Sequence, residues 1–378
     1  MRGNIFGERF VVVSFGESHG RCVGVVVDGC PAGLRLEKED IQRDLDLRRP
    51  SNTTISTSRK EEDEVEILSG VFKGHTTGAP ICALVWNRDV RSEDYEEVAY
   101  RPRPSHADYY AHIKYGGFND YRGGGRFSGR ITAGFVIAGA IAKKLLLETL
   151  GIEVVAYVLE IGGVRAEEFT LEDARKFRYL NEVRAPTTRA AEKMRDRIIE
   201  ARGRGDSVGG VIECVAVNLP IGLGEPVFDT LDGDLAKALM AIPGARGVEF
   251  GAGFRAAAMT GSQHNDPLAI RDGIVVSEKN DAGGVVGGLS TGMPLVMRVA
   301  FKPPSSIALK QKTVDLREMR EVEFSVPGRH DACIVPRAVP VVEAMVAITL
   351  ADHAIRAGLI PPVLKPRGGD LEDPRQLL

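Results

Sequence analysis

Three arginines alternate with glycines in the segment 121–130, whose sequence is YRGGGRFSGR. Glycine leaves the backbone amides open to close approach and reaches backbone angles that other residues avoid. The guanidinium group of arginine offers a planar fork of donors that matches phosphate and carboxylate groups. The segment therefore predicts a binding site for a small, highly charged anion.

Two histidines occur in comparable settings. His19 lies in the sequence GESHG at 16–20, and His106 lies in RPSHAD at 103–108, close after Arg103. Imidazole gains and loses a proton near neutral pH, so either residue could act as a general acid or base. Either could also have a purely structural role, His19 as a hydrogen-bonding turn residue and His106 as a cap or turn residue.

Further charged residues extend the candidate site. Arg48 and Arg49 precede a proline at the start of a polar loop, where ligand binding and surface charge are equally good interpretations. Arg329 and Asp331 flank His330 in a glycine-led turn, either as a structural ion pair or as a charged pair of the site. Other arginines occur among acids at helical spacing and are predicted to lie on solvated faces: Arg184, Arg189, Arg195, Arg197 and Arg202.

The composition argues against several classes of protein. Lys and Arg total 49 and Asp and Glu total 52 in the 378 residues, and the net charge of -3 favours neither nucleic acid nor an anionic membrane as a partner. The longest apolar run, 131–147, is interrupted by two lysines, and the five cysteines form no CxxC pair. His106, Asp108 and His112 match no strong metal-ligand spacing, so no metal is expected. We therefore expect a cytoplasmic protein that acts on a small molecule.

Two other functions have weaker support. The sequence GAGFRA at 251–256 matches the dinucleotide fingerprint if alanine is allowed at its last position, which suggests a nicotinamide-dependent oxidoreductase, although no well-defined helix follows. The segment 122–130 resembles an RGG element of RNA-binding proteins, although few aromatic residues are interleaved with its arginines. The P-loop sequence of nucleotide triphosphatases does not occur.

Short strands and helices follow one another without the regular alternation of βαβ units. This order favours an α+β fold with antiparallel strands, and no composition break divides residues 1–378 into more than one domain. The arginine-glycine loop runs directly into a helix, whose positive N-terminal end would favour an anion. Periodicity predicts strands at 10–15, 22–29, 65–72, 79–86, 154–161, 210–218 and 293–301, and helices at 37–47, 131–150, 187–201, 231–241 and 338–356.

Three separated motifs resemble those of the chorismate synthase family, and the likeness covers nearly the whole chain. The motifs are GESHG at 16–20 continuing to DGCP at 28–31, GRFSGRIT at 125–132, and GRHD at 328–331 with Glu343. Further segments fall where the family has its ligand loops, at 103–108, 261–266 and 302–306.

The resemblance implies a lyase of the shikimate pathway, which leads to the aromatic amino acids. Such an enzyme converts 5-enolpyruvylshikimate 3-phosphate to chorismate by a 1,4-anti elimination of phosphate, and it requires reduced FMN without net redox change. NADPH would enter only as an indirect reductant. The implied fold is a β-α-β sandwich with helices between antiparallel sheets, assembled as a homotetramer without nucleic-acid or membrane partners.

By matching positions, the resemblance assigns roles to individual residues. The catalytic residues would be His19, His106 and Asp331. The substrate would be bound by Arg48, Arg49, Arg103, Ser128, Arg130 and Arg329. Flavin contacts would come from Arg48, Phe127, Ser128, Gly129, Pro243, Gly244, Gly287, Lys302, Pro303, Pro304, Ser305, Ser306 and Arg329, with Lys302 and the two serines suited to the FMN phosphate.

The chain departs from the common family pattern at four positions. Ser105 stands where glycine is usual, Ala332 where proline is frequent, and Leu47 and Thr54 where many members have arginine. The change at Thr54 weakens any nicotinamide or second phosphate contact there. The larger fungal members, which reduce their own flavin, carry added segments of which this chain shows no sign, so we expect it to depend on flavin reduced elsewhere.

Overall fold

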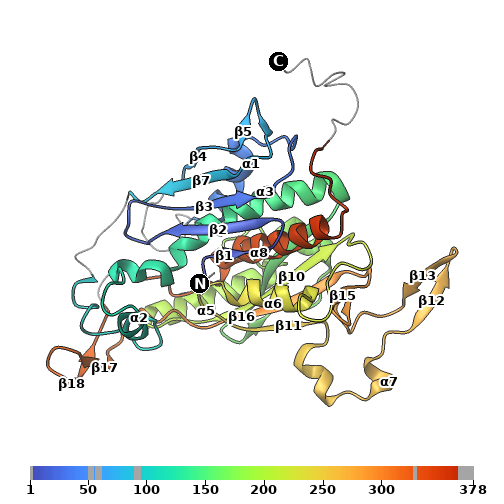
Figure 1. Cartoon of the computed structure of the whole chain (residues 1–378). Helices are drawn as coiled ribbons and strands as arrows, with labels where there is room; N and C mark the ends of the chain where they lie inside the picture. The colour runs from blue at the N-terminus through green and yellow to red at the C-terminus, as the bar shows by residue number, and fades with distance from the viewer. Residues whose placement is uncertain (1–2, 50–54, 56–61, 89–94, 327–329, 365–378) are drawn as a thin grey trace.

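Two antiparallel sheets enclose a layer of helices in the computed structural model, which describes residues 3–49, 55, 62–88, 95–326 and 330–364 (Figure 1). The first sheet has the strand order β1-β2-β3-β7-β4, and the second has the order β11-β16-β10-β8-β9. Neighbouring strands in both sheets are antiparallel. The α+β sandwich predicted from the sequence, with helices between antiparallel sheets, is confirmed.

Both sheets present one face to the helices. In β16, for example, Leu295, Met297 and Val299 are buried and alternate with more accessible residues, which is the period of a strand with one covered face. The strands of the first sheet are β1 (Ile5–Phe6), β2 (Val11–Gly16), β3 (Cys22–Asp28), β7 (Ile81–Trp86) and β4 (Val65–Ile67). Those of the second are β11 (Ala245–Phe250), β16 (Leu295–Phe301), β10 (Gly210–Val217), β8 (Glu153–Ile161) and β9 (Val164–Arg165).

The helical layer consists of α1 (Lys38–Arg48), α3 (Thr132–Leu150), α6 (Leu231–Met240) and α8 (Val335–Arg356). α3 and α8 are apolar on nearly all sides, as expected of helices that are covered on every face. They approach so closely that a Cβ atom on Gly139 would lie 2.2 Å from Cβ of Ala344. α8 is long and apolar enough to cross a membrane, but 94% of its apolar window is buried inside the protein, as in a core helix.

Two element boundaries differ from the prediction for local reasons. The predicted strand 65–72 is divided at Gly70, whose φ of 82° is unsuited to a strand, so that β4 pairs with β7 while β5 (Val71–Phe72) pairs with β6 (His75–Thr76). The last helix begins at Val335, before the predicted 338, and Pro336 lies in its first turn. Proline is tolerated there because backbone N–H groups in the first turn have no acceptor within the helix.

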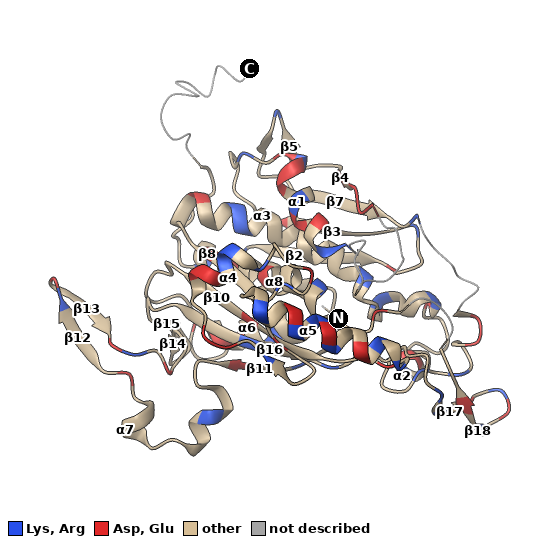
Figure 2. Cartoon of the chain, turned by 180° about the vertical axis from the view of Figure 1, so that it is seen from behind, with Lys and Arg blue, Asp and Glu red and all other residues tan. Residues whose placement is uncertain are grey.

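The prediction of a solvated face was wrong for Arg184. This residue precedes α5 (Thr188–Gly203), has a φ of 60°, donates to the carbonyl oxygen of Leu47 and lies 5.4 Å from the centre of the Tyr179 ring. Helical spacing does not apply to it because it lies outside the helix. On α5 itself, charges of both signs cover the outer face, and Arg195 is exposed as predicted (Figure 2).

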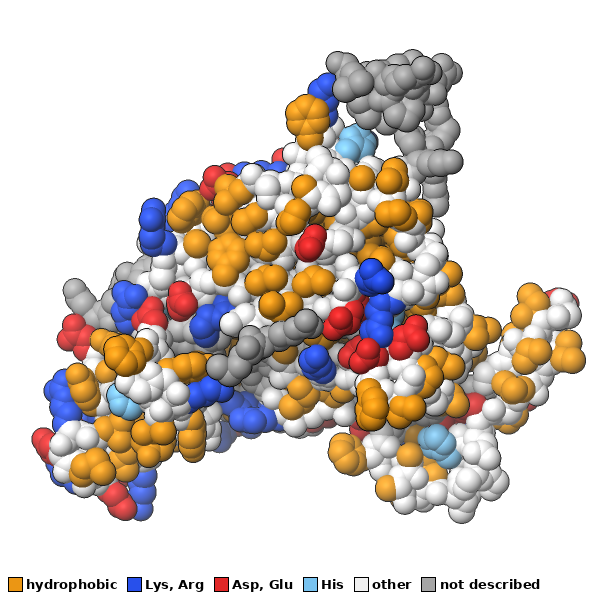
Figure 3. Space-filling model, in the orientation of Figure 1, with side chains coloured by type: hydrophobic (Ala, Val, Ile, Leu, Met, Phe, Trp, Pro, Cys, Tyr) orange, Lys and Arg blue, Asp and Glu red, His pale blue; other side chains and the backbone are white. Residues whose placement is uncertain are grey.

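The remaining elements lie around the sandwich, and the hairpin β12-β13 extends away from it (Figures 1 and 3). Leu268, Ile270, Ile274 and Val275 of this hairpin are 59–77% exposed. The other elements are α2 (Asp108–Lys114), η2 (Arg122–Phe127), η3 (Gly129–Ile131), α4 (Leu171–Phe177), η4 (Gly253–Ala258), α7 (Gly261–His264), β12 (Leu268–Arg271), β13 (Ile274–Ser277), β14 (Val285–Val286), β15 (Leu289–Ser290), β17 (Gln311–Asp315) and β18 (Arg320–Phe324). One buried apolar cluster is shared by both sheets and the helices between them, which favours the single domain that remains a prediction for 1–378.

Candidate active site

The arginine-glycine loop forms η2 and brings the two predicted histidines together. Gly123, Gly124 and Gly125 have φ values of 58°, 84° and 52°, in the left-handed region that other residues rarely adopt. A Cβ atom on Gly123 would lie 2.1 Å from Nδ1 of His19, and one on Gly124 would lie 3.0 Å from Cε1 of His106. Both imidazole rings therefore pack against the bare glycine backbone of this loop.

His106 belongs to a hydrogen-bonded group with Arg103 and Asp108. Nδ1 of His106 lies 2.6 Å from Oδ1 of Asp108, and Arg103 donates to the two carboxylate oxygens of Asp108 at 2.7 and 2.8 Å. Burial alone would raise the pKa of Asp108, but the hydrogen bonds from Arg103 and His106 hold this pKa far below its usual value. The ionised carboxylate favours the tautomer of His106 that carries its proton on Nδ1, so Nε2 is the atom that can accept another.

The segment Lys302–Ser306 lies against the histidine loop. Ser306 Oγ accepts from Arg103 at 3.1 Å, and Ser305 Oγ donates to the carbonyl oxygen of Ser105 at 3.1 Å. Nζ of Lys302 lies 2.5 Å from Ser305 Oγ, and burial together with neighbouring arginines lowers the pKa of this lysine. One lysine, one arginine and two hydroxyl groups form a donor set that fits a phosphate group.

The other predicted flavin residues differ in how they are placed. The amide of Lys302 donates to the carbonyl oxygen of Gly244 at 2.9 Å, which sets Pro243 and Gly244 beside the same segment. Phe127 is 40% exposed at the end of η2. Gly287 lies in the turn between β14 and β15, and no hydrogen bond among the described residues joins it to the segment of Lys302.

The backbone of Ser105 has a conformation that suits the glycine expected at this position from the family resemblance. Ser105 has a φ of 58°, in the left-handed region that favours glycine. Its carbonyl oxygen still accepts from Ser305, so the departure from the family pattern leaves the loop contact in place.

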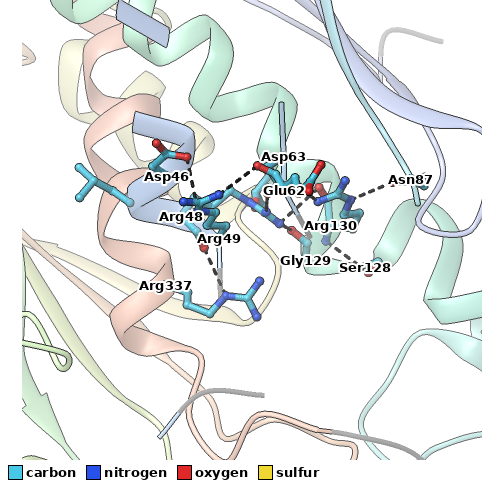
Figure 4. A network of polar contacts seen from close by, with 12 residues as sticks. Asp46, Arg48, Arg49, Glu62, Asp63, Asn87, Ser128, Gly129, Arg130 and Arg337 are labelled. Carbon is cyan, nitrogen blue, oxygen red and sulfur yellow. Dashed lines mark hydrogen bonds and ion pairs between the residues drawn. The ribbon is translucent and has the colours of Figure 1, made fainter. Parts of the chain in front are cut away.

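A second charged cluster joins the C-terminal end of α1 to η3 (Figure 4). The carboxylate of Asp63 lies between two predicted substrate arginines: Arg48 donates to Oδ2 at 3.0 Å, and Arg130 donates to Oδ1. The side chains of Arg48 and Arg130 are 4% and 9% exposed, and that of Asp63 is 0% exposed. Burial alone would raise the pKa of Asp63, but the two guanidinium groups hold it below its usual value.

Asn87 connects this cluster to the loop of His19. Its Oδ1 accepts from Nε of Arg130 at 2.9 Å, and its Nδ2 donates to the carbonyl oxygens of Glu17 and Gly20 at 3.0 and 2.8 Å. The amide of Asn87 therefore bonds both to Arg130 and to the segment that carries His19.

The third motif reaches the same cluster through Arg337, in the first turn of α8. Arg337 donates from Nε to the carbonyl oxygen of Arg48 at 3.3 Å and pairs with Oδ2 of Asp331 at 2.6 Å. Asp331 thus lies near the end of α1, while Arg329 lies outside the described residues. The side chain of Arg49 is 41% exposed and is paired with an acid of its own helix.

The other loop arginines are turned to protein groups. Arg122 pairs with Asp120 at 2.8 Å, and Arg126 donates to the carbonyl oxygen of Gly16 at 2.8 Å and to Ser14 Oγ at 3.1 Å. These contacts leave the loop unlike an open RGG element, which needs accessible guanidinium groups along a nucleic-acid backbone.

The backbone amides of the Gly251 turn are likewise hydrogen-bonded to groups of the protein. The amide of Ala252 donates to the carbonyl oxygen of Asp281, and that of Phe254 donates to a carboxylate oxygen of Glu249. The short 3-10 helix that follows does not provide the long helix of a dinucleotide fold.

Sequence reasoning missed four residues of the site: Asp63, Asn87, Tyr95 and Arg337. The ring of Tyr95 meets that of His19 edge to face, with centroids 5.0 Å apart, and lies 5.9 Å from the guanidinium carbon of Arg103. None of these residues has a local sequence signal, because each is defined by contacts with distant segments. No group of three or more potential metal ligands occurs within the part of the chain that the structure describes.

The fold and the site together define an α+β protein whose glycine loop sets two histidines beside clustered cations. The family model for chorismate synthase matches residues 10–355. The chain is 58% identical over 357 residues to a chorismate synthase of Korarchaeum cryptofilum, covering 94% of this chain and 99% of the relative. It is 53% identical over 362 residues to one of Dehalococcoides mccartyi, covering 96% and 99%.

A solved structure agrees with these sequence comparisons. The crystal structure of a chorismate synthase superposes with a TM-score of 0.73 at 32% identity, covering 93% of each chain. This chain belongs to the chorismate synthase family, and it is an enzyme of the lyase class.

Proposed function

We propose that this enzyme converts 5-enolpyruvylshikimate 3-phosphate to chorismate and phosphate by a 1,4-anti elimination, with reduced FMN bound and no net redox change. The observation that carries the proposal is the contact of His19 and His106 with adjacent glycines of the arginine loop. His106 also contacts the guanidinium group of Arg103, and Asn87 joins Arg130 to the loop that carries His19. A substrate with one phosphate and two carboxylates requires such a concentration of cationic donors.

The arginines, the histidines and Asp331 have different roles in the elimination. Arg48, Arg103 and Arg130 hold and orient the anionic groups, and donors already in place stabilise the charge that develops as phosphate departs. His19 and His106 handle protons, one beside the departing phosphate, and Asp331 helps to relay the C6 proton of the substrate. When bound, reduced FMN supplies electron density transiently to the allylic system and recovers it.

Lys302, Ser305 and Ser306 would hold the FMN phosphate, because they form a compact donor set. Replacing Lys302 by alanine is expected to raise the dissociation constant of FMN at least about tenfold, through loss of a charged hydrogen bond. A fluorescence titration with FMN measures the change. Lys310→Ala is the matched control, because Lys310 is an exposed lysine that lies four residues after Ser306. Equal FMN affinity in the two variants would show that Lys302 does not bind the FMN phosphate.

Replacing Gly123 by alanine is expected to lower kcat at least about tenfold, because the new methyl group would take the place of the His19 ring. Gly151→Ala is the matched control: Gly151 has φ 68° and ψ 14° against φ 58° and ψ 13° at Gly123, but nothing lies within 4 Å of its Cβ position. The two variants carry similar backbone strain, so steady-state kinetics isolates the displacement of His19. Equal kcat values would show that the position of His19 is unimportant.

An anaerobic assay of phosphate release tests the proposed function itself. Release with chemically reduced FMN, and none with oxidised FMN, is the expected result. Net consumption of NADPH matched to product would instead identify a nicotinamide-dependent oxidoreductase. In our proposal NADPH enters only as an indirect reductant of the flavin.

We also propose that the enzyme is a cytoplasmic homotetramer without nucleic-acid or membrane partners. The exposed apolar side chains of the β12-β13 hairpin support self-association, because a single copy leaves them in water (Figure 3). Light scattering or analytical ultracentrifugation measures the assembly state.

A further inference from the structure

We infer that Asp63 is a positioning residue, which holds the guanidinium groups of Arg48 and Arg130 in a fixed arrangement for binding the substrate's anionic groups. The inference rests on the proposed function, because it concerns how those anions are held. Asp63 itself touches neither substrate nor cofactor in this role and acts through the two arginines.

The geometry of Asp63 fits a fixed support. Its two carboxylate oxygens are divided between the two arginines, one oxygen for each, and its side chain is 0% exposed (Figure 4). A carboxylate shared by two guanidinium groups sets both their separation and their relative orientation. It also reduces the repulsion between two like charges that are buried side by side.

Neighbouring groups complete the orientation of each arginine. Nε of Arg48 donates to Thr132 Oγ1 at 3.0 Å, and another nitrogen of Arg48 donates to the carbonyl oxygen of Gly129 at 3.0 Å. Nε of Arg130 donates to Asn87 Oδ1 at 2.9 Å. Each guanidinium group is thus held from two sides, and Asp63 is a support that both share.

The backbone of Asp63 provides a second observation. Asp63 has a φ of 46°, in the left-handed region that aspartate and asparagine adopt more readily than most other residues with a side chain. Its carbonyl oxygen accepts from Nε2 of Gln42 at 3.1 Å, so α1 holds the backbone of Asp63 while the two arginines hold its side chain. Asparagine is well tolerated in this backbone conformation, so Asp63→Asn removes the charge without adding strain.

A simpler role for Asp63 makes the opposite prediction. If the carboxylate served only to cancel positive charge, its removal would strengthen the attraction for an anionic substrate and lower KM. If it positions the arginines, its removal weakens substrate binding although the site becomes more positive, because the amide nitrogen of asparagine is a donor and cannot accept from the second guanidinium group. The sign of the change in KM therefore separates the two roles.

The experiment compares Asp63→Asn with Glu62→Gln in anaerobic kinetics with reduced FMN. We expect KM for 5-enolpyruvylshikimate 3-phosphate to rise at least about tenfold in Asp63→Asn, with a smaller change in kcat, because the contacts of His106 do not involve Asp63. Glu62→Gln removes the same charge from the adjacent residue, whose side chain is 71% exposed, and should leave KM unchanged. An unchanged or lower KM in Asp63→Asn would overturn the inference.

Asp63→Glu keeps the test decisive if Asp63→Asn fails to fold. This variant retains the charge but moves the carboxylate by one methylene group, so a positioning role again raises KM and a role in charge balance alone leaves it unchanged. Crystal structures of the variants give a readout that does not depend on turnover: the Arg130 guanidinium should leave Asn87, and its retention there would overturn the inference. Wild-type enzyme that releases no phosphate would refute the proposed function, whereas active wild type with an unaltered Asp63 variant would refute only the inference.

Discussion

Replacing His106 by alanine lowers kcat about a hundredfold or more while the enzyme remains folded, if the site works as proposed. This is a loss of about 2.7 kcal/mol of transition-state stabilisation. The bond to Asp108 sets the proton on Nδ1 of His106, and contact with Gly124 sets the direction of the ring. Alanine has no group that can transfer the proton that His106 handles, and His19, which contacts Gly123 rather than Gly124, handles the other.

Anaerobic phosphate release with reduced FMN measures this effect, and thermal unfolding checks the fold. His75→Ala is the control, because His75 is exposed on β6, outside the candidate site, and its Nδ1 lies 3.1 Å from the carbonyl oxygen of Lys73. Turnover of His106→Ala equal to that of the control, with reduced FMN supplied, would exclude His106 from the proton transfers.

Replacing Glu343 by alanine is expected to lower the free energy of unfolding by about 3–5 kcal/mol, because it breaks a buried ionic network between the sheets and helices. Glu343 is 1% exposed and accepts from the amide of Ala156 at 3.0 Å, from Tyr179 at 3.2 Å and from Lys143 at 3.2 Å. Burial would lower the pKa of Lys143, but Glu343 and Asp44 raise it above its usual value. Without Glu343, the buried amide of Ala156 loses its acceptor, and Lys143 loses one of its two carboxylate partners while Asp44 remains at 2.6 Å.

Chemical denaturation and thermal scans measure this loss of stability. Glu192→Ala is the control, because Glu192 is an exposed acid on α5 and should change the stability by less than about 0.5 kcal/mol. Midpoints of unfolding that coincide for the two variants would show that the network contributes little. The same network explains Glu343 in the third motif, where a buried carboxylate supports the core rather than the reaction.

The fold class was predictable because its signals are local. Apolar periodicity predicted most strands of the two five-stranded sheets, and Gly151 predicted the end of α3, where its φ of 68° confirms a left-handed cap. The order of strands within the sheets was not predictable. β11 and β10 both pair with β16, and these pairings depend on which apolar faces come together after the chain has folded.

The sequence predicted the motifs of the candidate site, but it did not predict the residues that hold those motifs in place. Glycine, arginine and histidine in short segments indicated an anion and proton transfer, and the structure places His19 and His106, from two different segments, against one glycine loop. Asp63 escaped notice because it lies in the acidic run 61–64, where nothing distinguishes it from Glu62. In the folded chain the side chain of Glu62 is 71% exposed, whereas that of Asp63 is 0% exposed.

By itself the sequence determined the residue types of the site, their order, and the α+β class, since glycine content, charge spacing and apolar periodicity are properties of short segments. Only the tertiary structure decided which charges are buried against one another. Asp63 meets Arg130 across 67 positions, and Lys143 meets Glu343 across 200. Such pairs form only when the sheets and helices are packed together, because a charge gives up its water only where the fold supplies partners for it.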